Sequence, residues 1–345
     1  MAIYLVNYAL IIIYRCFASL GRVGRKSSSS NGFLWSRIIA IQLILLLSLR
    51  SARVGRDLTN YSEHFNNPEI IAERVSRVEV GYATVVDFLS KYFESFQAYL
   101  IVFAFLAIVP IAYSIRRCSA SPTISWFLYV SLGFYSFAFS GIRQSTAIAF
   151  IFLAFIFVQR RRAALFFIVV AIAVSFHLSA IIFAPAYFLY RLPWRRSTIP
   201  YAVVGVILVI FSRERIFSAF ISSLYPAYET VERDAFLGPL FWFILLAVAF
   251  YLYFPLRGDG AVRGMLNILV VAVLITTFAT LGTNVFRAAQ YYFIPFVFLF
   301  ARPVGGTEAS LRRLVRHLTL LSLVGYFIVN LLSDGYGILP YESIL

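Results

Sequence analysis

The chain has little of what a water-soluble protein needs on its surface. Only 13% of its 345 residues are charged, whereas 61% are hydrophobic and the mean hydropathy is +0.85. Acidic residues are especially few, with 15 against 30 lysines and arginines. A single water-soluble core cannot bury so many apolar side chains, so the composition excludes a soluble globular protein and requires a bilayer.

Metal-binding and redox-active side chains are also scarce. The two cysteines, Cys16 and Cys118, both fall in predicted inner loops, which excludes an outer disulfide, and no Cys-x-x-Cys pattern is present. The three histidines, His64, His177 and His317, are far apart in the sequence. We therefore expect no metal site and no cofactor.

Apolar stretches of roughly membrane-spanning or half-spanning length recur along the whole chain. They predict an all-α, polytopic integral membrane protein of about twelve transmembrane or half-membrane helices, with residues 1–345 forming a single transmembrane domain. The predicted spans are 1–14, 38–49, 97–115, 123–140, 144–158, 163–176, 178–190, 199–211, 237–256, 264–281, 288–301 and 317–331.

The basic residues are concentrated in the loops that this topology predicts to lie inside. With both termini outside, the inner loops hold 19 of the 30 basic residues, opposed only by Asp259 and Glu308. Membrane proteins carry this excess of arginine and lysine on the cytoplasmic side. The net charge of +15 is thus a topological signal, and we expect no nucleic-acid partner.

Residues 163–190 can be one long helix or two short ones. One helix would abolish the charge bias of the later loops, so we favour a hairpin. Each arm of about 14 residues spans roughly 21 Å, against about 30 Å of hydrocarbon. The turn at Phe176, His177 and Leu178 should then lie below the outer surface. Irregular backbone at that depth predicts an outward-facing cavity.

Two predicted outer segments, 50–96 and 212–236, are long enough to be structured. The first contains two amphipathic pieces, Glu69–Val78 and Tyr82–Phe96, which are typical of interfacial helices or a lid. On the inner side, the Ser27–Gly32 stretch predicts a flexible connection.

Ionisable residues at or below the outer membrane surface are the candidate functional residues, because burying them is costly without a purpose or a partner. An outward cavity lined by four arginines with few outer carboxylates would suit a diphosphate, since guanidinium groups bind phosphate oxygens in bidentate fashion. For Arg53 and Arg56, anchoring at the lipid headgroups is the alternative. The candidates are Arg53, Arg56, Asp57, Arg143, His177 and Arg287.

Two of these residues could act as a general base. Asp57 or His177 could accept a proton from a sugar hydroxyl, and Tyr61 could orient the sugar. Asp57 could instead pair with Arg53 or Arg56. The choice between Asp57 and His177 stays open.

These positions also form an ordered set of short motifs. They are Arg53-x-Gly55-x-Asp57-x-x-x-Tyr61, Glu79-x-Gly81-Tyr82, Gly141-Ile142-Arg143-Gln144, Phe176-His177-x-Ser179-Ala180, Arg287 in a tyrosine-rich span that includes Tyr291, and Pro340-Tyr341. In this order the sequence resembles the EpsG family of Wzy-like polymerases of bacterial exopolysaccharide and O-antigen. Arg56 and Leu58 depart from the threonine and tyrosine expected around the aspartate.

The resemblance implies a GT-C-like or Wzy-like helical bundle in the bacterial plasma membrane. Its activity would be a glycosyltransferase that joins undecaprenyl-diphosphate-linked oligosaccharide repeats at the extracytoplasmic face, with lipid diphosphate as the leaving group. Arg53, Arg56, Tyr61, Gln144 and Tyr291 would bind substrate. Asp57, Arg143, His177 and Arg287 would be catalytic. The expected partners are the lipid-linked substrates, membrane lipids, a chain-length regulator and other polysaccharide-assembly proteins.

Three other functions remain as alternatives. A transporter or flippase of lipid-linked oligosaccharides would need access from both faces, and the candidates gather on the outer one. A ligase of the O-antigen type would differ only in its acceptor. A membrane acyltransferase is disfavoured, because His177 has no acidic residue close to it in the sequence.

Overall fold

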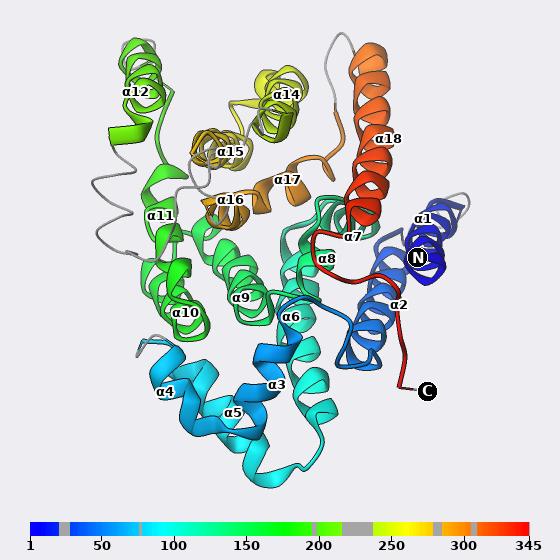
Figure 1. The fold of residues 1–345 in the computed structure, drawn as a ribbon. Helices are drawn as coiled ribbons and strands as arrows, with labels where there is room; N and C mark the ends of the chain where they lie inside the picture. Colours follow the sequence, from blue (N-terminus) through cyan, green and yellow to red (C-terminus); the bar gives the residue numbers. More distant parts are fainter. Residues whose placement is uncertain are drawn as a thin grey trace. The chain divides into compact units, whose positions relative to one another are not determined.

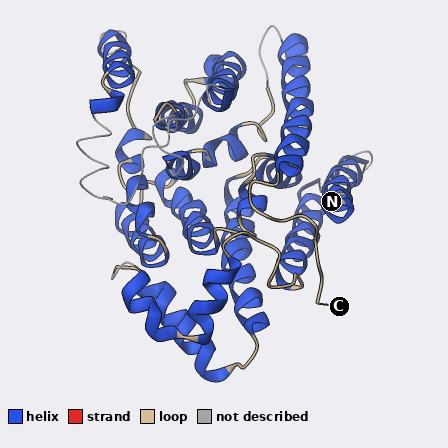
Figure 2. Ribbon diagram, viewed as in Figure 1, coloured by secondary structure: helices blue, strands red, loops and turns tan. Residues whose placement is uncertain are grey.

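The computed structural model describes residues 1–20, 28–75, 78–194, 199–215, 237–278, 285–304 and 309–344. Within these ranges the chain is helical, without strands, and only an isolated bridge joins Arg50 to Ser343 (Figure 2). Four helices in the described part are long and apolar enough to cross a membrane: Phe96–Cys118, Ile142–Gln159, Gly238–Leu256 and Ala309–Ser333. The prediction of an all-α fold is thus confirmed for the described residues, and the long apolar helices are consistent with a polytopic membrane protein.

The chain folds as two compact units. The first comprises Met1–Ala184, Phe300–Pro303 and Leu320–Leu345. In it α6 and α10 both pack on α9, and α2 packs on α6. Its helices are α1 (Ala2–Leu20), α2 (Ser28–Ser48), α3 (Leu58–Asn66), α4 (Ile71–Arg74), α5 (Val80–Tyr92), α6 (Phe96–Cys118), α7 (Pro122–Ser131), α8 (Phe134–Phe137), α9 (Ile142–Gln159) and α10 (Ala163–Phe176), with the 3-10 turns η1 (Pro68–Ile70) and η2 (Leu178–Phe183).

The second unit comprises Pro185–Leu299 and Val304–Thr319. Its helices α14 and α16 pack on α15. The elements are α11 (Ala186–Leu189), α12 (Ile199–Phe211), α14 (Leu237–Tyr253), η3 (Phe254–Leu256), α15 (Gly260–Thr276), α16 (Val285–Ala289), η4 (Gln290–Tyr292) and α17 (Ile294–Leu299), while α18 (Ala309–Ser333) continues from this unit into the first.

The predicted hairpin is broken at the expected residue. α10 ends at Phe176, and His177 is extended, with φ −156° and ψ 118°. The second arm differs from the predicted helix 178–190, because it is a 3-10 turn followed by the short α11. Pro185, which has no N–H group, separates the two pieces.

The amphipathic part of the outer segment 50–96 was only partly predicted. The predicted piece Glu69–Val78 is helical only as far as Arg74, as the 3-10 turn η1 followed by the four-residue α4, and residues 76–77 lie outside the described residues. The unpredicted α3 lies before them and buries Leu58, Tyr61 and Phe65. The predicted helix Tyr82–Phe96 corresponds to α5, which begins earlier and ends at Tyr92.

Two further boundaries differ from the predictions. α2 begins at Ser28, so the predicted loop Ser27–Gly32 is helical from its second residue. The predicted span 123–140 is interrupted between α7 and α8 at Gly133, whose φ of 85° ends the helix. Most of the second predicted outer segment, residues 216–236, lies outside the described residues.

The C-terminal tail fixes the start of the outer segment. Gly55 N–H and Arg56 N–H donate to the carbonyl oxygens of Gly337 and Tyr336, each at 2.8 Å. Gly55 has φ 131°, and a side chain there would overlap the Phe139 carbonyl. The glycine of the first motif is therefore required by backbone conformation and close packing. Figure 1 shows the chain running from this point into α3, α4 and α5, which lie together beside α6.

Candidate active site

A single buried carboxylate connects three segments of the first unit. Glu79, only 3% exposed, precedes α5. Its Oε2 lies 2.7 Å from Arg143 Nη1 of α9. Its Oε1 lies 3.1 Å from His177 Nδ1 and accepts a hydrogen bond from the Leu178 N–H at 2.8 Å. Glu79, Arg143 and His177 are called the Glu79 cluster below.

The break after α10 creates one of these contacts. Because His177 is extended, the Leu178 N–H is free of the regular helical ladder and donates to Glu79 instead. The His177 N–H still closes the helix on the Ala173 carbonyl at 3.0 Å. The broken hairpin thus presents one backbone donor and one imidazole to the same carboxylate.

A glycine allows α5 to approach this break. A Cβ at Gly81 would overlap Ser175 Oγ of α10 and lie 3.1 Å from Ser175 Cβ. α5 packs directly on α10. The second motif, Glu79-x-Gly81-Tyr82, therefore combines a carboxylate with the small residue that brings it within reach of His177.

Arg143 lies in the first turn of α9 against an aromatic wall. Its guanidinium carbon is 5.4 Å from the centre of the Tyr82 ring, and it interacts electrostatically with Tyr61. Such cation–π contacts stabilise the cation and restrict its orientation. The wall is itself fixed, because the Tyr82 hydroxyl lies 2.9 Å from His64 Nδ1 and 3.4 Å from the Tyr99 hydroxyl.

The electrostatic environment keeps Glu79 ionised. Burial alone would raise its pKa, but the hydrogen bond from His177 and the nearby guanidinium of Arg143 lower the pKa below its usual value. An ionised carboxylate only accepts hydrogen bonds. His177 must therefore donate from Nδ1, which in the neutral imidazole leaves Nε2 as the acceptor.

Burial distinguishes the roles these three side chains can play. The side chain of Glu79 is 4% exposed, whereas those of Arg143 and His177 are 24% and 26% exposed. The carboxylate is thus enclosed by its partners, whereas the side chains of Arg143 and His177 each remain about a quarter exposed. Such an arrangement can bind an anionic group through Arg143 and accept a proton at His177.

The structure brings together part of the predicted site. Arg143 and His177 converge on Glu79, and Tyr61 lies in the aromatic wall beside Tyr82. Gln144 follows Arg143 in α9 and is buried. Arg143 and His177 are 64 and 98 residues from Glu79 in the sequence, yet they meet at one carboxylate.

The charged residues before α3 form a different environment. Arg53 and Arg56 are exposed and Asp57 is partly exposed. Asp57 is the N-cap residue of α3, but its side chain makes no capping hydrogen bond. Among the described residues it forms no ion pair with Arg53 or Arg56.

The last two predicted site residues belong to the second unit. Arg287 lies in α16 and is partly exposed. Tyr291 lies in η4 and is fully buried, at 0% exposure. Their roles stay predictions.

Two residues of the site were missed as functional candidates. The sequence motifs include Glu79 and Tyr82, but neither was assigned a role. Glu79 is nevertheless the acidic partner of His177, which has no acidic residue close to it in the sequence. Glu79 could have been identified from its position directly before the amphipathic helix α5 and two residues before Gly81. The reason for disfavouring acyl transfer, the missing acid, therefore no longer holds.

Comparison with known proteins gives one match. The sequence model of the EpsG family matches residues 33–343, which is nearly the whole chain and includes every residue of the Glu79 cluster. The comparisons with curated proteins and with solved structures give no match. The family is associated with polysaccharide polymerase activity of the glycosyltransferase kind. On this match the chain belongs to the EpsG family.

Proposed function

We propose that the protein joins lipid-diphosphate-linked oligosaccharide repeats into a polysaccharide, with the Glu79 cluster as its catalytic centre. The observation that carries the proposal is the three-way contact of Glu79 with Arg143, His177 and Leu178. Family membership selects glycan transfer over acyl transfer, which a carboxylate–histidine pair could also perform.

His177 is the general base in this proposal. A hydroxyl at the non-reducing end of one repeat loses its proton to His177 Nε2 as its oxygen attacks the anomeric carbon of the donor repeat. Glu79 holds the imidazole by Nδ1 and stabilises the imidazolium that forms, as the acid of a catalytic triad does. Asp57, the other candidate base, lacks such a partner among the described residues.

Arg143 stabilises the leaving group. As the new carbon–oxygen bond forms, the bond from the anomeric carbon to the phosphate oxygen breaks, and lipid diphosphate departs with the electron pair. The guanidinium of Arg143 binds this developing charge, while Glu79 and the Tyr82 ring hold it in place. The glycosyl-phosphate bond supplies the driving force without nucleotide.

The extracytoplasmic face is the proposed site of action. Glu79 belongs to the segment 50–96, which the distribution of basic residues predicts to lie outside. Substrate on that face would be the lipid-linked repeat in its bacterial plasma membrane, undecaprenyl diphosphate being the carrier that the family resemblance implies.

Reconstitution with one substrate tests the function. Purified protein in liposomes would be given a lipid-linked oligosaccharide repeat alone, and products would be separated by length on a gel. A ladder of added repeats is expected. Repeats that cross the bilayer without extension would identify a flippase instead, and transfer only to an added non-repeat acceptor would identify a ligase.

A further inference from the structure

Among the described residues of the first unit, Arg50 is buried and forms no ion pair. Arg50 follows α2 and is 2% exposed. The C-terminal tail holds its backbone, since the Ser51 N–H donates to the Glu342 carbonyl at 2.8 Å and an isolated bridge joins Arg50 to Ser343. The backbone at Arg50 is therefore held against the C-terminal tail.

The guanidinium of Arg50 has contacts but no anion. Its central carbon lies 4.9 Å from the centre of the Phe139 ring, while Nε and Nη1 are buried without a hydrogen bond. The described ion pairs involve Glu79 and Asp87, not Arg50. Burial lowers the pKa of Arg50 to about 10, so the side chain still carries its charge at neutral pH. A buried charge without a partner destabilises the folded state.

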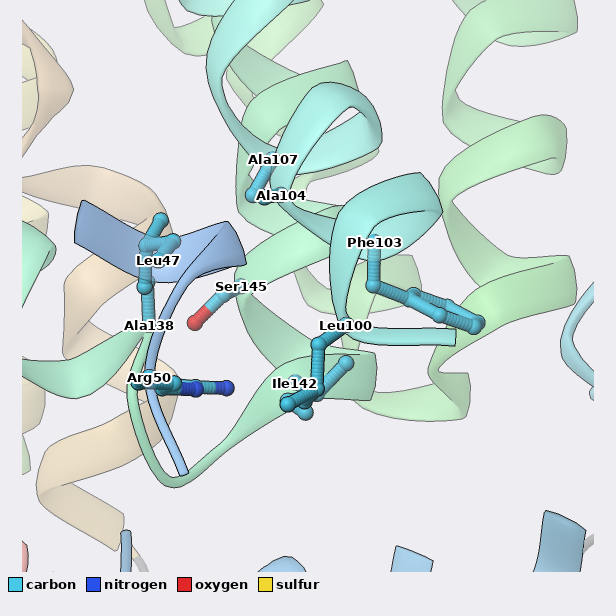
Figure 3. Close-up of a pocket in the computed structure, with 9 residues that line it drawn as sticks. All are labelled: Leu47, Arg50, Leu100, Phe103, Ala104, Ala107, Ala138, Ile142 and Ser145. Atoms are coloured by element: carbon cyan, nitrogen blue, oxygen red, sulfur yellow. The ribbon is translucent and has the colours of Figure 1, made fainter. Parts of the chain in front are cut away.

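The same guanidinium faces a small pocket in Figure 3. Ser145 lies across from it, with its hydroxyl turned toward Arg50 in the view, and that hydroxyl is also buried without a partner. Ser145 lies in the first turns of α9, where the helix dipole is positive. The other lining residues are apolar: Leu47, Leu100, Phe103, Ala104, Ala107, Ala138 and Ile142.

The polar groups and apolar walls of the pocket determine which kind of ligand it can bind. The pocket offers one positive charge and one hydroxyl donor, surrounded by aliphatic and aromatic walls. A phosphate carries more negative charge than one guanidinium neutralises. Several of its oxygens would also be left without a hydrogen-bond donor. A compact, monovalent anion with a weakly held hydration shell, such as chloride, meets both polar groups and tolerates the apolar walls. We propose that Arg50 and Ser145 form a halide-binding site in the first unit.

The site would stabilise the packing around the Glu79 cluster without taking part in the reaction. Its lining comes from α2, α6 and α9 and from the residues just before α9, and Ile142 directly precedes Arg143. An anion there offsets the buried charge at the point where these helices meet. The inference does not depend on the proposed polymerase activity, and stability rather than turnover is its readout.

Thermal unfolding in matched salts tests the site. The purified full chain in detergent would be melted in sodium chloride, sodium bromide, sodium gluconate and sodium phosphate at equal ionic strength. Chloride and bromide should raise the Tm of the wild type by roughly 2–4 °C over gluconate once the halide is in excess of its Kd. Equal Tm values in chloride and gluconate, or a larger rise in phosphate, would overturn the proposal.

Variants separate binding from general salt effects. Arg50→Met should abolish the halide shift and, in gluconate, melt no lower than the wild type, because it removes the uncompensated charge. Arg117→Met, which removes an exposed arginine from α6, should keep the full shift. If Arg50→Met does not fold, Ser145→Ala and broadening of the chloride NMR line by the protein replace it. The halide site is contradicted if Ser145→Ala broadens the chloride NMR line as much as the wild type does. It is also contradicted if Arg50→Met keeps the halide-dependent rise in Tm.

Discussion

The two charged regions of the outer segment are organised in opposite ways. Arg53, Arg56 and Asp57 are neighbours in the sequence, yet they are exposed or partly exposed and form no ion pair with one another. Glu79 lies far in sequence from both Arg143 and His177 and nevertheless binds both. Proximity along the chain therefore does not identify the site. The buried, mutually bonded cluster is the one preorganised for chemistry.

The largest expected effect follows from removing the base within the cluster. In His177→Asn the amide can still bond Glu79 from the position of Nδ1, but no acceptor remains at the position of Nε2. Loss of general base catalysis should lower the rate of repeat addition by about 10²–10⁴-fold. The assay is the initial rate of ladder formation. His317→Asn, at an exposed position of α18, is the control, and a His177→Asn rate within threefold of wild type would exclude His177 as the base.

Arg143→Lys should have the next largest effect. Lysine keeps the charge but loses the planar fork that contacts Glu79 and leaves an edge for the donor. The loss of one charge-assisted hydrogen bond predicts a rate reduced by roughly 10–100-fold. Membrane insertion and Tm should stay close to wild type. Chains of normal length made at a normal rate by this variant would remove Arg143 from the mechanism.

A smaller effect is expected from a substitution that displaces the Glu79 cluster but keeps all of its side chains. Gly81→Ala should displace α5 from α10, because the added Cβ overlaps Ser175 Oγ. We expect a rate lower by about tenfold, since small shifts of positioned groups reduce catalysis strongly. Adding Ser175→Ala should restore part of the rate. No recovery in the double variant would show that Gly81 acts in some other way.

The smallest effects should come from the residues before α3. Arg53→Gln and Arg56→Gln remove exposed charges that can only attract an anionic donor at a distance, so each should lower the rate by no more than about threefold, and less at high salt. Asp57→Asn should change the rate as little. Rates would be compared at low and high ionic strength. A loss of a hundredfold in Asp57→Asn would transfer the role of base from His177 to Asp57 and reverse the comparison.

Local signals explain what could be predicted from the sequence. Apolar runs located α6, α9 and α10, and the distribution of basic residues favoured a break at His177, which the structure has. Arg143 and His177 stood out as ionisable residues in apolar surroundings. α3 was missed, although Leu58, Tyr61 and Phe65 have helical spacing.

Tertiary contacts explain what could not be predicted. The role of Glu79 depends on two partners from α9 and from the end of α10, and no local pattern specifies that these segments meet α5. Arg50 is similar, since its burial depends on the C-terminal tail and on α6 and α9. The local sequence around a charged residue next to a membrane span does not specify whether its side chain is exposed to solvent or buried in the core.

The most direct test of the Glu79 cluster is the rate of repeat addition by Glu79→Gln in liposomes. Glutamine has nearly the same shape but lacks the charge that holds Arg143 and stabilises the His177 imidazolium. The proposed role of Glu79 predicts a ladder from the wild type and from Glu69→Gln, an exposed position in the same segment, and at least about a hundredfold slower extension by a folded Glu79→Gln protein. A Glu79→Gln protein that extends repeats at the wild-type rate would contradict it.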